Sequence, residues 1–478
     1  HPSGGPAVSR VLLLLSRTSY RAEAFVAAAH RLDVDITVGS DHRQALADLT
    51  AGGSLTLGVE DVDRSVAIIV RFASDYPLAA IVAAEDDFAP VAAAASEALG
   101  LRHHPPEAVR SARNKAVMRR RLAAAGFPSP WFHVASVEDD AEAAAARARY
   151  PCVLKPLALS ASRGVIRADT PEEFGRASNR IRGILAQPDA LTRSGHGVAQ
   201  ILIEAYMPGC EVAVEGIVVG GELQTLAVLD KPDPMEGPYF EETILVTPSC
   251  LADSVQREIV SCVQRSVAIL GLDDGPVHAE LRVDGERASP LEIAPRSIGG
   301  RCSTILRFEP EATLEELILR HAFGMPIHEY SRAPGASGVM MLPIPVAGVL
   351  RKVGGSEAAL EIPGIEGLEI IELYFDNTKG EFVHEPNPLV ASNLVDLQAK
   401  VVETGADFGI CFDGDADRLM LVDEKGKMVG CDLLTALVAK SFLADNPGSA
   451  IVYDLRSSKA LQEDILSAGG KPVRGRVG

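Results

Sequence analysis

The chain has 478 residues, 47% of them hydrophobic, and a formal net charge of −19 at pH 7. Its length predicts several domains with sizeable cores, and the acidic balance argues against general binding to nucleic acid or to anionic membranes. The seven cysteines have no paired short spacing, which excludes a zinc ribbon and favours a reducing cytoplasm. The apolar run at 11–15 is too short for a signal-peptide core, and no run approaches the roughly 18 apolar residues of a membrane span.

The N-terminal part of the chain alternates between strand-like and helical patterns. Strands are expected at 11–15, 35–38 and 79–84, and helices at 21–31, 62–74 and 89–99. This alternation predicts a parallel sheet covered by helices. The turns between these elements contain no GxGxxG, so a dinucleotide fingerprint is absent.

The middle of the chain contains a basic helix, short strands and a long helix. The helices are expected at 114–125 and 254–270, the strands at 151–156, 198–204 and 211–219, and a loop of small residues at 160–164. Gly126-Phe127-Pro128 ends the basic helix, and Met207-Pro208-Gly209 forms a turn between two of the strands.

Two short apolar runs, 278–283 and 291–296, are separated by the turn Asp284-Gly285-Glu286. A hairpin of these runs can place Glu280 and Glu292 on one face. Neighbouring carboxylates repel unless a cation lies between them, and hard oxygen ligands suit Mg²⁺ shared with substrate phosphates. Arg296 lies nearby and could bind a phosphate or carboxylate bidentately. The pattern indicates phosphoryl transfer from a nucleotide, and an ordinary charged surface hairpin is the alternative.

Upstream residues provide groups that an ATP molecule requires. Lys115 and Lys155 could neutralise phosphate oxygens, and the loop at Gly164 could bring backbone N–H groups close to a phosphate. Glu204 could accept from the adenine amino group, with the backbone of residues 205–206 completing the adenine hydrogen bonds, and Glu211 could hold the ribose hydroxyls.

Each of these residues also has a simpler interpretation. Lys155 would be a solvated charge at the end of a strand, and Gly164 would be an ordinary turn residue. Glu204 and Glu211 would be charges on edge strands. His278 is expected to be a hydrogen-bonded packing residue rather than a metal ligand.

The order of the motifs is more specific than any one of them. They are Asn114-Lys115, Val153-Leu154-Lys155-Pro156, Ser162-Arg163-Gly164-Val165, Ile203 to Gly209, His278-Ala279-Glu280 and Glu292-Ile293-Ala294-Pro295-Arg296. As a set they resemble the ATP-grasp superfamily of carboxylate–amine ligases, and the resemblance covers residues 8–370. Leu229 to Pro234 and Gly237 to Glu242 resemble the branch that includes L-amino-acid ligases.

This resemblance implies an α/β protein with a Rossmann-like pre-ATP-grasp domain and a two-lobed α+β ATP-grasp domain. The expected boundaries are 1–110 for the first domain, 111–205 for the first lobe and 206–370 for a second lobe that is truncated at its C-terminal end. The implied ATP-binding residues are Lys115, Lys155, Ser162, Arg163, Gly164, Glu204, Tyr206, Glu211 and His278. Glu280 and Glu292 would bind Mg²⁺, or Mn²⁺ in its place, and Arg296 and Lys231 would be catalytic.

The implied reaction has two steps. A substrate carboxylate, expected to belong to an amino acid, attacks the γ-phosphate of ATP to give an acyl phosphate and ADP, and an amine then displaces phosphate. The expected partners are therefore a small-molecule carboxylate and an amine. Many relatives self-associate, so the resemblance also implies a possible homo-oligomer. Two departures weaken the pattern: Ala294 stands where many relatives have a metal-binding Asn, and Ala161 stands where they have a second loop glycine.

A second acidic cluster, Asp413-Gly414-Asp415-Ala416-Asp417-Arg418, follows a strand expected at 408–412. Acids at alternate positions with small residues between them can direct three carboxylates at one divalent cation. An EF-hand is a competitor because Glu424 falls at its twelfth position, but Arg418 replaces the required glycine and strands flank the loop. A solvated acidic turn without metal is the other alternative.

Glu385-Pro386-Asn387-Pro388-Leu389, residues 403–407 and this acidic loop resemble the second domain of phosphomannomutase/phosphoglucomutase enzymes, over residues 371–478. The resemblance implies a C-terminal α/β mutase-type domain in which Asp413, Asp415 and Asp417 bind Mg²⁺ and Arg418 contacts a phosphoserine. No Thr-Ala-Ser-His-Asn-Pro-like stretch supplies that serine, so the fragment is not expected to catalyse isomerisation alone.

The leading interpretation is therefore an ATP-dependent ligase fused to a mutase fragment. The alternatives are a phosphohexomutase fragment and a non-catalytic nucleotide-binding protein. The junction near Ile370 has no linker and falls within both resemblances, so we interpret it as a chimeric join rather than an evolved fusion. Intact genomic DNA that encodes this reading frame across Ile370 would contradict that interpretation.

Overall fold

The computed structural model describes residues 10–16, 19, 21–41, 52–157, 159–160, 162–187, 190, 199–299, 301–341, 394–404, 408–412, 419–453 and 457–475. The chain divides into two compact units, residues 1–343 and 344–478, and each is described by itself. Within the described ranges, no helix has the length and apolar character needed to cross a membrane.

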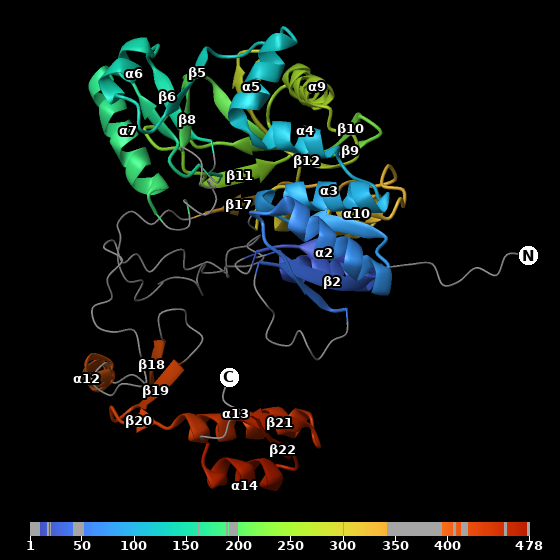
Figure 1. Cartoon of the computed structure of the whole chain (residues 1–478), viewed down its shortest axis with the longest axis vertical. Coiled ribbons are helices and arrows are strands. Elements are labelled where there is room, and N and C mark those ends of the chain that lie inside the picture. The colour runs from blue at the N-terminus through green and yellow to red at the C-terminus, as the bar shows by residue number, and fades with distance from the viewer. Residues whose placement is uncertain are drawn as a thin grey trace, which may run out of the picture. The chain divides into compact units, whose positions relative to one another are not determined.

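The first unit begins with a parallel sheet in the order β3-β2-β1-β4 (Figure 1). Its strands are β1 (Arg10–Leu14), β2 (Asp35–Ser40), β3 (Ser54–Thr56) and β4 (Ala80–Ala83), and its helices are α1 (Ala22–Arg31), α2 (Val62–Asp75) and α3 (Ala89–Leu99). Residues 11–14 are fully buried, as expected for a central strand that is covered on both faces. The predicted parallel sheet is confirmed, and β3 is an additional edge strand.

Helices α4 (Pro106–Arg113) and α5 (Lys115–Ala124) lead into the first lobe, whose antiparallel sheet has the order β5-β8-β6-β7. The other elements of the lobe are β5 (Phe132–Ser136), α6 (Ala141–Arg147), β6 (Cys152–Pro156), β7 (Ile166–Ala168), α7 (Pro171–Leu185) and β8 (Gln200–Ala205). Phe174, Ile181 and Leu185 form an apolar stripe on α7 and are buried in the core of the lobe. Figure 1 shows α6 and α7 on the outer side of this sheet.

The second lobe contains a six-stranded antiparallel sheet in the order β13-β12-β9-β10-β11-β17. Its elements are β9 (Cys210–Val219), β10 (Glu222–Lys231), β11 (Ile244–Thr247), α9 (Asp253–Leu270), β12 (Gly275–Asp284), β13 (Arg287–Ala294) and β17 (Ser337–Met340). Residues 211–218 of β9 are all buried, because α9 covers one face of the sheet and a second core covers the other.

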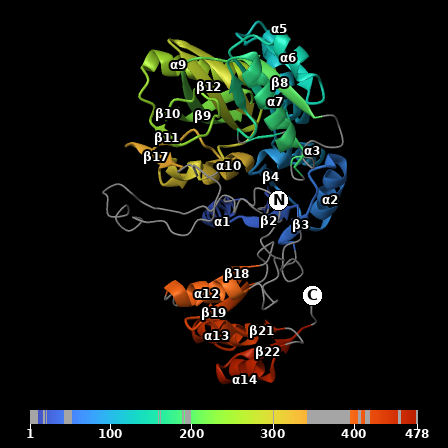
Figure 2. The same cartoon turned by 90° about the vertical axis from the view of Figure 1, so that its left-hand side faces the viewer.

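That second core joins the lobe to the N-terminal sheet. Helix α10 (Leu314–Ala322) lies between the two sheets in both Figure 1 and Figure 2. Phe25 of α1, Leu229 of β10 and Leu317 of α10 belong to one buried cluster. The remaining short elements are η1 (Asp86–Phe88), η2 (Cys302–Ile305), β14 (Arg307–Glu309), β15 (Ala312–Thr313) and β16 (Ser331–Arg332).

The second unit has a small core of its own, which includes Leu443, Leu461 and Ile465. Its described elements are α12 (Val395–Thr404), β18 (Phe408–Phe412), β19 (Leu419–Asp423), β20 (Met428–Val429), α13 (Cys431–Asp445), β21 (Ala450–Tyr453), α14 (Lys459–Ser467) and β22 (Lys471–Arg474). β18 and β19 are antiparallel, with Phe412 opposite Leu419. Strands therefore flank residues 413–418, as predicted, which disfavours the EF-hand alternative.

Candidate active site

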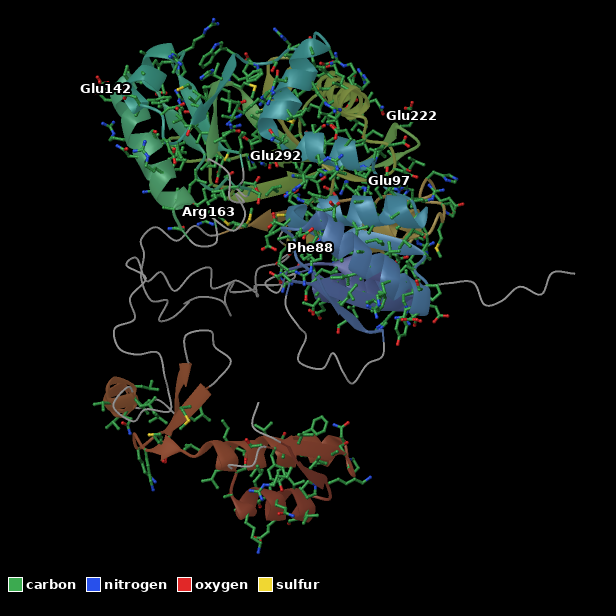
Figure 3. All side chains as sticks on the ribbon, viewed as in Figure 1. Phe88, Glu97, Glu142, Arg163, Glu222 and Glu292 are labelled. Atoms are coloured by element: carbon green, nitrogen blue, oxygen red, sulfur yellow. The ribbon has the colours of Figure 1, made fainter. Side chains whose placement is uncertain are left out.

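The predicted acidic hairpin is present as β12 and β13, and its register pairs Glu280 directly with Glu292. Directly opposed residues of an antiparallel pair project from the same face, so the two carboxylates are neighbours as the sequence predicted. Their side chains are 25% and 29% exposed, so both can be reached by a ligand. Figure 3 marks Glu292 on this sheet.

A lysine lies beside each of the two carboxylates. Lys115 Nζ is 3.2 Å from Glu292 Oε2, and Lys231 Nζ is 3.0 Å from Glu280 Oε1. The side chain of Asn114 caps α5 by accepting hydrogen bonds from the N–H groups of its first turn at 3.1 Å. This cap fixes Lys115 at the first position of the helix, where it faces the hairpin.

Lys231 lies among three carboxylates, those of Glu211 at 2.7 Å, Glu280 at 3.0 Å and Glu242. Burial alone would lower the pKa of Lys231, but Glu280, Glu211 and Glu242 raise it well above its usual value. Burial and the charge of Glu280 raise the pKa of Glu242. Oxygens of the three glutamates lie within 4.8 Å of one another, and the ammonium of Lys231 supplies the positive charge between them.

Glu204 is held between two cations inside the first lobe. Its carboxylate accepts from Arg119 Nε at 2.7 Å and pairs with Lys155 Nζ at 2.6 Å, and it is only 1% exposed. Burial raises the pKa of Glu204, but Arg119 and Lys155 outweigh burial and lower it to about 2. Both Glu204 oxygens are thus engaged within the protein, and acceptance from an adenine amino group stays a prediction.

The chain passes from the first lobe to the second at residues 205–209. The N–H groups of Ala205 and Tyr206 donate to the carbonyl oxygens of Trp131 at 2.8 Å and Pro151 at 2.9 Å. Both N–H groups are therefore engaged within the protein, and adenine binding by the backbone of residues 205–206 stays a prediction.

A cavity of about 490 Å³ lies beside this crossing, and Tyr206, Glu211 and Lys231 are among the residues that line it. The Arg167 guanidinium lies 4.1 Å from the centre of the Tyr206 ring, a cation–π arrangement. Glu211 pairs with Arg282 at 3.2 Å in addition to Lys231. The cavity therefore combines an aromatic wall with three carboxylates, Glu211, Asp233 and Glu236, and two cations, Arg167 and Lys231.

The small-residue loop adopts a tight turn at Ser162, Arg163 and Gly164. Ser162 has φ of 54° and Gly164 has φ of 75°. A Cβ on Gly164 would lie 2.9 Å from Pro156 Cγ, so only glycine fits without displacing that ring. Lys115 Nζ donates to the carbonyl of Leu159 at 3.4 Å, which joins the start of the loop to the hairpin. Figure 3 labels Arg163 in the first lobe.

His278 precedes the first hairpin acid, and its ring is hydrogen-bonded to Glu215 on one side and lies near Glu280 on the other. Its Nδ1 lies 3.1 Å from Glu215 Oε2, and its Nε2 lies 3.8 Å from Glu280 Oε1. Burial lowers the pKa of His278, but Glu215 and Glu280 raise it to about 9. A binding role for His278 toward ATP stays a prediction.

Arg296 contacts the N-terminal domain. Its Nη2 donates to Asp86 Oδ2 at 2.7 Å, and its Nη1 donates to the carbonyl of Ser297 at 2.9 Å. Burial raises the pKa of Asp86, but the Arg296 guanidinium lowers it below its usual value. The guanidinium has further N–H donors for a carboxylate or phosphate.

Five residues of this site were missed by the sequence interpretation, namely Asp86, Arg119, Glu215, Glu242 and Arg282. Arg119 follows Lys115 by four positions and so shares its helix face, which was an available signal. Asp86 follows the end of β4, where ligands bind in α/β sheets. Glu215 and Arg282 stand in buried strands and gave no local signal.

The second predicted metal cluster, Asp413, Asp415 and Asp417 with Arg418, lies outside the described residues, as do Ala161, Ile370 and the 385–389 motif. Ala294 is described: it is buried and pairs with His278 in the hairpin. Among the described residues, the Lys115, Lys155, Glu204, Lys231 and hairpin groups belong to one connected site in the first unit.

Comparison with known proteins gives three family matches. The ATP-grasp N-terminal domain matches residues 26–103, the ATP-grasp domain matches residues 148–305, and the alpha/beta/alpha domain II of phosphoglucomutase/phosphomannomutase matches residues 337–426.

Individual relatives agree with this division. Alanine–anticapsin ligase of Bacillus amyloliquefaciens is 30% identical over 57% of this chain and 61% of its own length. Phosphomannomutase/phosphoglucomutase of Pseudomonas syringae pv. tomato is 43% identical over 23% of this chain and 24% of its own length. The chain thus spans less than two thirds of the ligase and about a quarter of the mutase.

A solved structure shares the fold of the first unit. The crystal structure of L-amino acid ligase from Bacillus licheniformis has a TM-score of 0.61 and 23% identity, covering 74% of this chain and 85% of that one. The chain therefore contains an ATP-grasp domain preceded by an ATP-grasp N-terminal domain, and on their C-terminal side it carries a segment similar to domain II of phosphoglucomutase/phosphomannomutase.

Proposed function

We propose that the chain is an ATP-dependent ligase that joins the carboxylate of an amino acid to an amine and releases ADP and phosphate. The observation that carries the proposal is the direct pairing of Glu280 with Glu292, with Lys115 and Lys231 beside them. The relative named alanine–anticapsin ligase supports an amino acid as the acid substrate.

The groups at the hairpin fit a divalent cation. Glu280 and Glu292 offer hard, partly exposed carboxylate oxygens on one face, which suits Mg²⁺, or Mn²⁺ in its place. Ala294 offers no side-chain oxygen, so water or a phosphate oxygen would complete the ligand set. When bound, the cation would neutralise the terminal phosphates of ATP.

The nucleotide would be held by residues from both lobes. Lys115, Lys155 and the loop at 162–164, Arg163 included, would bind phosphate oxygens. Tyr206 and Glu211 line the 490 Å³ cavity, to which we assign the base and the ribose. Glu204, by pairing with Lys155 and Arg119, keeps the phosphate-binding lysine in place.

The chemistry would proceed in two balanced steps. A substrate carboxylate oxygen attacks the γ-phosphorus, and the bond to the β–γ bridging oxygen breaks, so that ADP leaves with that oxygen. The amine nitrogen then attacks the acyl carbon, phosphate leaves, and the nitrogen loses a proton to give the amide. Arg296 would hold the carboxylate or acyl phosphate, and Lys231 would offset the repulsion between anions that otherwise dominates the barrier.

The second unit is proposed to contribute no catalysis of its own. It corresponds to about a quarter of a phosphomannomutase/phosphoglucomutase, whose isomerisation needs a phosphoryl donor as well as a metal. The Asp413–Asp417 loop would then act only as a divalent-cation site.

Phosphate release from Mg-ATP tests the proposal, measured with each standard L-amino acid in turn as substrate. We expect one or more amino acids to stimulate release, and Glu292→Ala to reduce it to the level without enzyme, because the variant removes a metal ligand. Glu222→Ala, at the exposed start of β10, is the control and should leave release unchanged.

Two other results would contradict the ligase. ATP binding without stimulated release would favour a non-catalytic nucleotide-binding protein. Interconversion of hexose phosphates by the whole chain would favour the mutase.

A further inference from the structure

The segment after β13 and Pro295, which consists of Arg296, Ser297 and Ile298, is held by charged side chains from distant parts of the first unit. Asp86 binds the Arg296 guanidinium at 2.7 Å. Both oxygens of Glu215 accept from the N–H of Ile298, at 3.1 and 3.0 Å. Ser297 and Ile298 are 2% and 3% exposed, so little competition from water weakens these bonds.

Arg21, which immediately precedes α1, provides the third hold on this segment. Its Nη1 donates to Ser297 Oγ at 2.6 Å and to the carbonyl of Ile298 at 3.0 Å. Its Nη2 donates to Glu315 Oε1 at 2.8 Å, and both side chains are 3% exposed. One guanidinium thus connects the N-terminal domain, helix α10 and the segment behind Arg296.

We propose that Arg21 is a positioning residue for the acid substrate: by fixing Ser297 and Ile298 it sets where the Arg296 guanidinium presents its donors to the substrate carboxylate. The proposal rests on the ligase function proposed above and deepens it, because it gives the N-terminal domain a part in carboxylate binding. Arg21 touches neither substrate nor ATP and acts only through the segment 296–298.

A guanidinium that binds a carboxylate has to be held in one orientation. A guanidinium binds a carboxylate well only when its planar fork is aligned with both oxygens. Arg296 alone has a long flexible side chain, and its backbone leaves the sheet at Ala294, where β13 ends. The bonds from Arg21 and Glu215 replace the support that a strand partner would give to this backbone.

A matched control exists on the same helix. Arg31, at the other end of α1, binds Glu316 of α10 at 3.0 Å, just as Arg21 binds Glu315. Arg31 also donates to Thr313 at 3.1 Å. Its removal therefore weakens the junction of α1 with α10 without touching residues 296–298.

The test compares Arg21→Met, Ser297→Ala and Arg31→Met in the full chain. We expect Arg21→Met to raise KM for the best amino-acid substrate of the panel by roughly ten- to a hundredfold, as a misplaced binding group does, with KM for ATP unchanged. Ser297→Ala, which removes one hydrogen-bond acceptor and little volume, should raise the same KM less. Arg31→Met should change neither KM.

Hydrogen–deuterium exchange tests the physical basis without any substrate. The amides of the segment 296–299 should exchange faster in Arg21→Met and in Ser297→Ala than in the wild type, and at the wild-type rate in Arg31→Met. If Arg21→Met does not fold, Ser297→Ala still decides the comparison.

The outcomes separate the two proposals. Unchanged exchange in the Ser297 and Arg21 variants would overturn the positioning role. Faster exchange would also overturn the positioning role if KM rose equally for ATP and for the amino acid, or if neither KM changed. Either result would leave the proposed ligase function intact. Absence of amino-acid-stimulated turnover in the wild type would overturn the ligase, and the substrate role of Arg21 with it.

Discussion

Glu204 is a buried carboxylate whose charge depends on two buried cations. Its pKa is lowered from 4.5 to about 2: burial raises it, and Arg119 and Lys155 more than offset that effect. Because the folded-state pKa lies below the unfolded-state value, the ionised form stabilises the fold fully above about pH 4.5. That stabilisation is lost progressively as the pH falls toward 2.

We expect Glu204→Gln to lower the free energy of unfolding at pH 7 by about 3–5 kcal/mol, since it leaves buried cations without their carboxylate. In urea denaturation at a series of pH values, the gap between wild type and variant should stay constant down to about pH 5 and then narrow. Glu107→Gln is the control, because Glu107 also binds two arginines but is 65% exposed, and this substitution should lower the free energy of unfolding far less. If the difference in unfolding free energy between wild type and variant widened as the pH fell, the lowered pKa of Glu204 would be contradicted.

At the scale of elements, the turn between β8 and β9 brings the two lobes together beside the 490 Å³ cavity. Gly209 in this turn has φ of 101°, and a Cβ there would lie 2.1 Å from the carbonyl oxygen of Val283 in β12. Arg282 also donates to the Gly209 carbonyl at 2.8 Å. The approach of turn and hairpin therefore depends on a residue without a side chain.

We expect Gly209→Ala to be much more destabilising than Gly220→Ala, and to weaken ADP binding as well. Gly220, in the turn between β9 and β10, also has positive φ, but a Cβ there meets nothing within 4 Å. Its substitution should therefore cost only backbone strain, about 1–2 kcal/mol. Urea denaturation measures the loss of stability, and calorimetric titration measures the affinity for ADP. An equal loss of stability in the two variants would contradict the inferred clash between a Cβ at position 209 and the Val283 carbonyl.

At the scale of the whole molecule, the two units have separate cores. The cluster around Leu443, Leu461 and Ile465 lies within the second unit, and the candidate active site is built within the first. We therefore expect removal of the residues after 343 to leave the geometry of the candidate active site unchanged.

We expect a chain ended at Pro343 to bind ADP with unchanged affinity and to bind fewer Mn²⁺ ions than the full chain. The lost ions would be those of the proposed loop at Asp413, Asp415 and Asp417. Calorimetry measures the first quantity, and an electron paramagnetic resonance titration measures the second. The full chain with all three aspartates changed to Asn is the control, and loss of ADP binding on truncation would show that the units depend on each other.

Local pattern predicted the elements that carry the site, but not the contacts between them. The alternation of 278–283 and 291–296 around a short turn was sufficient to predict a hairpin that can place Glu280 and Glu292 on one face, because side chains alternate along each strand. The strands and helices of the N-terminal sheet followed from apolar runs of suitable length.

The ion pairs could not be predicted in the same way, because their partners meet only when the chain is folded. Arg119 and Glu204 are 85 residues apart, and Asp86 and Arg296 are 210 apart. In each pair the partners lie on different elements, α5 with β8 and η1 with the segment after β13, and no periodicity within one segment encodes such a meeting. Glu204 was therefore interpreted through its expected ligand, while its protein partners remained unknown.

The core shared by the N-terminal sheet and the second lobe has a consequence for recombination between related genes. A crossover near residue 104 would divide one hydrophobic cluster between two parents, since Phe25 and Leu317 pack in it from opposite sides of that point. Each half would then have to match a foreign surface to native packing density. A crossover near residue 343 separates two units that each retain a core of their own, so it would divide neither of these two clusters between different parents.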